Sequence, residues 1–144
     1  MKSFKYIMCS LLFLTFFCGC INTDKSMFLS KIKIKVGGMT LDAYKGSNAS
    51  DLDVIKNKTP IMISKKEKLE IYSDIKDEDG YVTQILYLIK DGEVIRMSSN
   101  TSEIIKSGNI DKYNLPQEDG VYIGHVFRQS KNGEVNYFFK IQIN

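Results

Sequence analysis

The amino-acid sequence predicts an all-β domain built as an antiparallel sandwich, and three observations lead to this fold class. Short segments in which apolar and polar residues alternate recur about every ten residues. Turn-forming pairs such as Gly37-Gly38 and Asp91-Gly92 separate these segments, as they do in β-hairpins. No segment carries a helical period of convincing length. Many short strands with turn chemistry between them are typical of a sandwich.

A β-hairpin is predicted ahead of the main group of strands. Residues 30–36 alternate strictly, which places their isoleucines and their valine on one face of a strand. Residues 39–44 alternate again after Gly37-Gly38, so the two strands can pair. Residues 46–58 are polar and predict a linker with at most a brief turn at its centre.

Three lysines occupy the other face of the first predicted strand. Lys31, Lys33 and Lys35 alternate with the apolar residues. Lysines of this kind guard an edge strand or form a solvated face. They also suit contact with anionic lipid, and both interpretations stay open at this point.

The remaining strands follow in a regular series. We predict them at residues 61–64, 69–74, 81–90, 94–98, 102–105, 121–128 and 134–143. Asp91-Gly92 closes one hairpin, and Lys131-Asn132-Gly133 closes another. Residues 106–120 are left without a predicted strand.

The N-terminus has the features of an export signal. Lys2 and Lys5 precede an uncharged apolar run over residues 7–17, which is too short to span a bilayer comfortably as a helix. The run ends in Phe17-Cys18-Gly19-Cys20, which resembles the lipobox of bacterial lipoproteins. That family favours Leu and a small residue where this chain has Phe17 and Cys18. The alternatives are an uncleaved membrane anchor, or an ordinary signal-peptidase site that leaves Cys20 unmodified.

The lipobox resemblance implies an anchored protein. Cys20 would be the lipid attachment site, with cleavage after Gly19 and acyl chains inserted in the membrane. The expected organisation is a signal peptide at 1–19, a tether at 20–30, a hairpin and linker at 31–58, and a sandwich domain at 59–144. The expected location is the cell envelope, on the outer leaflet of the plasma membrane or, in a two-membrane cell, on the outer membrane.

Cysteine content and charge narrow the chemistry of the mature domain. The chain has three cysteines, of which Cys9 and Cys18 would leave with the signal while Cys20 would carry lipid. No thiol would then remain for a disulfide, for thiolate catalysis or for a cysteine metal site. Loss of Lys2 and Lys5 leaves 18 basic against 17 acidic residues. Such a near-neutral domain gives no electrostatic case for nucleic-acid binding.

One motif makes the predicted fold more specific. Residues 115–122 combine Leu115, Asp119-Gly120 and Tyr122, and resemble the tyrosine corner of immunoglobulin-like domains. The resemblance implies that the Tyr122 hydroxyl donates a hydrogen bond back to the backbone. Antibody domains have a cysteine two residues after this tyrosine, where this chain has Gly124. The expected fold is therefore an immunoglobulin-like antiparallel β-sandwich, preceded by the short hairpin.

A second motif begins at an acidic segment, residues 77–82, and continues to residues 90–94. It is similar to the D-x-D-G…G-x-x-V run of bacterial immunoglobulin-like surface domains. Asp74, Asp77 and Asp79 are weak calcium candidates, because clustered carboxylates suit this cation. The spacing lacks the later ligands of an EF-hand loop, and Asp and Gly are ordinary turn residues. We therefore interpret the segment as a solvated turn and expect no metal or cofactor.

The single histidine and the C-terminal aromatics are the remaining candidates. His125 has neither a cysteine nor a second histidine to work with, so a packed or surface residue is expected. Phe138 and Phe139 are adjacent, so one ring must lie on the outer face of its sheet. That ring either offers a contact surface or is covered by the N-terminal hairpin.

No catalytic motif is visible, so we do not expect an enzyme. The expected function is that of a membrane-anchored binding or structural module that contacts a protein or a glycan of the envelope. The alternative is an accessory lipoprotein of the inhibitor, immunity or phage-exclusion type. The binding residues cannot be predicted from the sequence.

Overall fold

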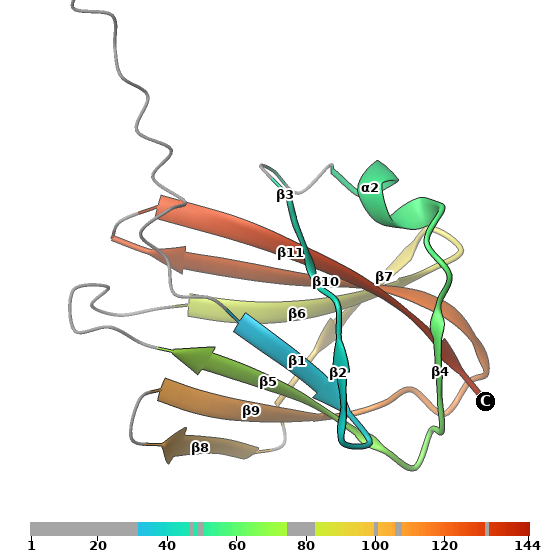
Figure 1. Cartoon of the computed structure of the whole chain (residues 1–144), viewed down its shortest axis with the longest axis horizontal. Coiled ribbons are helices and arrows are strands. Elements are labelled where there is room, and N and C mark those ends of the chain that lie inside the picture. The colour runs from blue at the N-terminus through green and yellow to red at the C-terminus, as the bar shows by residue number, and fades with distance from the viewer. Residues whose placement is uncertain are drawn as a thin grey trace, which may run out of the picture.

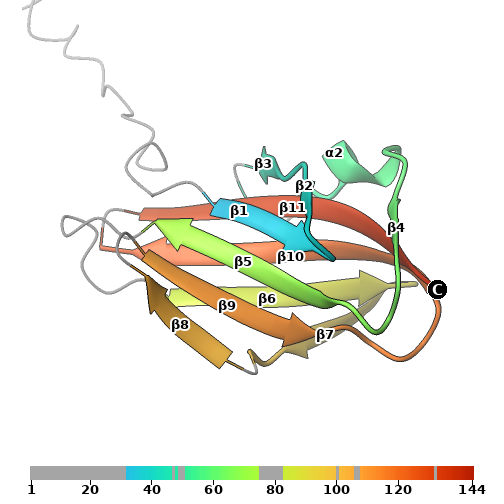
Figure 2. The ribbon, with the colours of Figure 1, turned by 60° about the horizontal axis from the view of Figure 1, so that its bottom comes forward.

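The computed structural model describes residues 32–46, 48, 51–74, 83–99, 101–105, 108–131 and 133–144. These residues form two packed antiparallel sheets, which Figure 2 shows as two layers. The first sheet has the order β2-β1-β5-β9-β8 and contains β1 (Ile32–Val36), β2 (Met39–Leu41), β5 (Lys68–Asp74), β8 (Thr101–Ile105) and β9 (Gly108–Asn114). The second has the order β3-β11-β10-β6-β7 and contains β3 (Tyr44–Gly46), β6 (Thr83–Lys90), β7 (Glu93–Met97), β10 (Gly120–Ser130) and β11 (Gly133–Ile143). A short strand, β4 (Ile61–Ile63), runs parallel to the end of β11.

The predicted all-β sandwich is confirmed. The order β1-β5-β9-β8 corresponds to strands A-B-E-D of an immunoglobulin sandwich, and β11-β10-β6-β7 corresponds to G-F-C-C′. The predicted hairpins at Gly37-Gly38 and Asp91-Gly92 are also present, with all four turn residues at positive φ. Positive φ at both turn positions suits the right-handed twist of the flanking strands.

The core lies between the two sheets and consists of the side chains that point inward from alternate positions of their strands. Ile34 and Val36 on β1, and Leu69 and Ile71 on β5, are buried from one side. The second sheet contributes residues of β6, β10 and β11 from the other side, among them Leu86, Leu88, Tyr122, Val126, Phe139 and Ile141. Burial of apolar surface on this scale is the main stabilising term of the described domain, whose residues include no cysteine.

Residues 32–58 take part in both sheets. The predicted hairpin is β1 and β2, and β1 also pairs with β5 along its whole length. The predicted linker supplies β3, which pairs with β11, and a single helical turn, α2 (Asp53–Lys56). Figure 1 shows β3 crossing β11, and Figure 2 shows α2 next to β11. The described sandwich therefore begins at Ile32, ahead of the boundary expected at residue 59.

Strand β9 is the longest described element that the sequence did not predict. It runs between β5 and the edge strand β8 of the first sheet. Its inward-facing residues include Asp111, whose carboxylate accepts a hydrogen bond of 2.7 Å from the side-chain amide of Gln84 on the opposite sheet. Tyr113 also faces inward, and burial raises the pKa of its hydroxyl to about 12. Because the inner face of β9 carries polar residues, its sequence lacks the alternation of apolar and polar residues that would predict a strand.

The predicted tyrosine corner is present. The Tyr122 hydroxyl donates a hydrogen bond of 3.0 Å to the backbone oxygen of Glu118. Lys90 binds the Glu118 carboxylate and donates to the backbone oxygen of Asp119 at 2.9 Å. The hydrogen bond to Glu118 is the main reason why the pKa of Lys90 is raised. The loop before β10 is thus fixed to β6 and to β10 itself.

Replacing Tyr122 with phenylalanine removes only the corner hydrogen bond. We expect Tyr122→Phe to lower the free energy of unfolding by about 1 kcal/mol, because it leaves a backbone carbonyl without its partner. Urea denaturation followed by circular dichroism measures this change. Tyr44→Phe is the control, since no hydrogen bond of the Tyr44 hydroxyl is found among the described residues. Equal effects of the two substitutions would contradict a role for the corner.

Candidate functional site: an apolar hollow on the outer face of one sheet

Three rings stack across the outer face of the second sheet. Tyr87 on β6, His125 on β10 and Phe138 on β11 are direct neighbours in the strand register. The Tyr87 and His125 ring centroids are 5.6 Å apart, and the His125 and Phe138 centroids are 4.8 Å apart, with nearly parallel planes. Cross-strand aromatic pairs of this kind stiffen a sheet face.

His125 is a packed residue that forms part of this ring stack. Its Nε2–H donates a hydrogen bond of 2.8 Å to Oδ1 of Asn136, which is itself buried. Because an amide oxygen only accepts, the proton of this hydrogen bond belongs to Nε2. The bond holds the imidazole ring in one orientation. His125 therefore contributes a flat, fixed surface between two aromatic rings.

Phe138 and Phe139 are both fully buried, on opposite faces of β11. Phe138 is 0% exposed and Phe139 is 1% exposed. Each ring lies against a glycine of a neighbouring strand: a Cβ on Gly46 would come within 2.6 Å of the Phe138 ring, and one on Gly124 within 2.0 Å of the Phe139 ring. Of the two alternatives for the outer-face ring, the exposed contact surface is wrong, because Phe138 is covered. Its cover comes from β3 and α2 and not from the hairpin.

The segment that covers Phe138 also borders the site. α2 packs on β11 through the fully buried Ile55, and Lys140 on β11 donates a hydrogen bond of 2.6 Å to the backbone oxygen of Lys56. Leu52 directly precedes this turn and stands at the border of the covered area. Leu52 and Ile55 are three residues apart, which is the one sequence signal that could have revealed a helical turn with an apolar side.

Beyond this cover the sheet face opens into an apolar hollow with a volume of about 480 Å³. The hollow is lined by Leu52, Tyr87, Ile89, Val94, His125 and Phe127. Val94 on β7 is 60% exposed, although it is a β-branched apolar residue beside other apolar residues. The lining side chains are apolar or aromatic, and the ring of His125 is already hydrogen-bonded through Nε2. A concave apolar surface of this kind is typical of a binding site.

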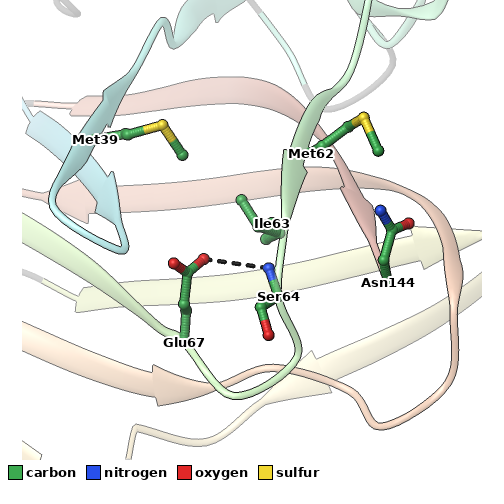
Figure 3. A pocket seen from close by; sticks show the side chains of 6 residues that line it. All are labelled: Met39, Met62, Ile63, Ser64, Glu67 and Asn144. Carbon is green, nitrogen blue, oxygen red and sulfur yellow. Dashed lines mark hydrogen bonds between the residues drawn. The ribbon is translucent and has the colours of Figure 1, made fainter.

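A second recess lies at the end of the sandwich where the C-terminus ends, with a volume of about 270 Å³ (Figure 3). Met39 on β2 and Met62 on β4 flank it, and both are exposed. The Glu67 carboxylate accepts a hydrogen bond of 3.2 Å from the backbone N–H of Ser64 at its base. Flexible methionines and a carboxylate make this recess less defined than the apolar hollow.

The residues singled out from the sequence are mostly not part of the hollow. Cys20 and the acidic residues Asp77 and Asp79 lie outside the described residues, and only the backbone of Asp74 is described, as the last residue of β5. Within the described part of the chain, no group of three or more His, Cys, Asp or Glu side chains could hold a metal ion. Of the single histidine and the C-terminal aromatics, His125 and Phe127 line the hollow.

Comparison with known protein families, with curated proteins and with solved structures found no match to this chain. Among the described residues, no helix is long and apolar enough to cross a membrane. The site is therefore assigned from its own geometry.

Proposed function

We propose that this protein is a lipid-anchored, non-enzymatic binding module of the cell envelope, which holds an apolar side chain of a partner protein in the hollow. The apolar hollow carries the proposal, because a monomeric protein rarely leaves such a surface open without a use. The lipobox-like sequence ending at Cys20 supports the anchor.

The chemistry of the lining favours a protein partner over a glycan. A sugar needs several hydrogen-bonding groups around the rings on which it stacks, whereas the hollow is lined by aliphatic and aromatic side chains. Rigid aromatic residues with an aliphatic border are the usual setting for an apolar anchor residue at a protein interface. The rings of Tyr87 and His125 would form its floor.

A substitution at the exposed border tests the proposal. Val94→Glu places a carboxylate at the apolar hollow, and we expect partner affinity to fall more than tenfold, which corresponds to about 1.4 kcal/mol or more. The free energy of unfolding should change by less than about 0.5 kcal/mol, because the Val94 side chain is 60% exposed. The measurement is quantitative co-purification of the partner with the lipidated full-length protein after crosslinking in its native envelope.

Val121→Glu is the matched control. Val121 is 42% exposed on the same outer face, on β10, but it does not line the hollow. Recovery of the same envelope protein with the wild type and with Val121→Glu, but not with Val94→Glu, is the expected result. Unchanged recovery with Val94→Glu would refute the assignment of the hollow.

A further inference from the structure

The outer face of the first sheet differs chemically from the face that bears the hollow. Lys33 and Lys35 on β1, Lys68 on β5 and Lys112 on β9 alternate with residues of the core and therefore point outward. We call these four residues the lysine face. Strand register places them close together, because β5 lies between β1 and β9.

Acidic residues lie on the same face and are fewer than the lysines. Glu70 lies among them and accepts a hydrogen bond of 2.7 Å from the Tyr72 hydroxyl. The Lys35 ammonium lies over the Tyr72 ring, 4.9 Å from the ring centroid. Asp74, at the end of β5, and Glu103, opposite Ile110 on the edge strand β8, take register positions on the same face. Positive charge is thus concentrated over β1 and the beginning of β5.

The opposite outer face has another character. Its described positions on β6 and β10 include Tyr87, Ile89, Val121, His125 and Phe127. This face also carries basic residues, with Arg96 opposite Tyr87 and Lys140 opposite Ile123, so the two outer faces differ mainly in the apolar and aromatic residues of β6 and β10. Figure 2 shows the sheet with the lysine face as the nearer layer.

We propose that the lysine face lies against an anionic membrane surface, so that the apolar hollow faces away from the bilayer. The inference rests on the lipid anchor of the proposed function, and charge complementarity identifies the occupant. Only a weak contact is needed, because the anchor keeps the domain at a high effective concentration near the lipid. The chain from Cys20 to Ile32 can reach roughly 40 Å, which leaves the domain free to lie on either face.

The orientation can be measured by energy transfer from tryptophan to lipid. The chain contains no tryptophan, so Thr40→Trp and Val94→Trp each introduce a single donor. Thr40 lies beside Lys35 in the register of β1 and β2, whereas Val94 borders the hollow on the other sheet. The lipidated full-length protein is placed in vesicles of phosphatidylcholine, with or without phosphatidylglycerol, that contain a dansyl-labelled headgroup.

We expect greater transfer from Thr40→Trp than from Val94→Trp in the anionic vesicles, and no difference in vesicles of phosphatidylcholine alone. Raising the salt from about 0.1 M to 1 M shortens the screening length from about 10 Å to 3 Å and should remove the difference. Because the salt titration uses unaltered lysines, it does not depend on the folding of a charge variant.

Charge reversal provides the specific test. The triple variant Lys33→Glu, Lys35→Glu and Lys68→Glu should lose the difference in anionic vesicles. A matched triple variant at Lys45, Lys58 and Lys131, which are exposed elsewhere, should keep it.

The opposite orientation, or a preference that is insensitive to anionic lipid and salt, would overturn the inference. Vesicle flotation separates the two proposals: a protein that does not float lacks the proposed anchor, whereas a floating protein without orientation contradicts only the lysine face.

Discussion

Replacing Cys20 with serine should release the protein from the membrane fraction. Serine cannot form the thioether to diacylglycerol, and the mature N-terminus would lose the acyl chains, each buried CH₂ of which contributes about 0.8 kcal/mol. Release requires that the apolar run at residues 7–17 is then cleaved as an ordinary signal, because an uncleaved run would hold the protein in the membrane without acyl mass. Membrane fractionation, together with the intact mass of the purified protein, measures both the location and the lipid.

Cys18→Ser is the matched control for this prediction. Cys18 lies two residues earlier, in the segment that would be removed, so its replacement should leave the lipid on Cys20 and the protein in the membrane. A Cys20→Ser protein that keeps its acyl mass would contradict the lipobox interpretation. So would a Cys18→Ser protein that loses this mass.

The second large effect is expected at Gly124, in the core of the sandwich. A Cβ added here would lie 2.0 Å from the Phe139 ring, and both residues are held in register on adjacent strands. We expect Gly124→Ala to lower the free energy of unfolding by about 3 kcal/mol, at the upper end of the usual cost of overpacking. Chemical denaturation of the purified protein measures this change.

The reason for this cost can be tested in a second background. Phe139→Ala should cost about 3–5 kcal/mol, because it leaves a cavity in the core. In that background Gly124→Ala should be neutral or stabilising, since the new methyl group fills part of the cavity. Phe139→Leu provides the same comparison if the alanine variant does not fold. Purely additive effects in both backgrounds would contradict a direct contact between ring and glycine.

Local patterns explain why much of the sandwich could be predicted. The hairpins at Gly37-Gly38 and Asp91-Gly92 depend on adjacent residues with positive φ, and such pairs are visible in the sequence. The corner at Tyr122 depends on a bond to Glu118, only four residues away. Alternation on β1 and β5 then assigns their core residues, whereas both faces of β10 carry apolar residues and alternation does not show which is buried.

The parts that sequence did not predict depend on contacts between distant segments. β9 carries Asp111 on its inner face, where a partner from β6 satisfies the carboxylate, so its polar composition resembles that of a loop. Phe138 is covered because β3, which ends at Gly46, and the helical turn α2 lie over β11. The hollow exists because that cover ends at Leu52, a boundary that no local pattern marks.

The two proposals assign a separate role to each side of the sandwich. The lysine face suits an anionic surface, and the apolar hollow on the opposite sheet would then point toward other proteins of the envelope. The stacked rings of Tyr87, His125 and Phe138 keep the floor of the hollow flat. A preformed floor lowers the conformational cost of binding.

Site-specific photocrosslinking in living cells tests the central claim most directly. A photoreactive amino acid at Val94 of the lipidated protein should give one discrete product with an envelope protein, and the same group at Val121 should not. A discrete product from Val121 with none from Val94, or equal products from both positions, would contradict the assignment of the hollow as the partner site.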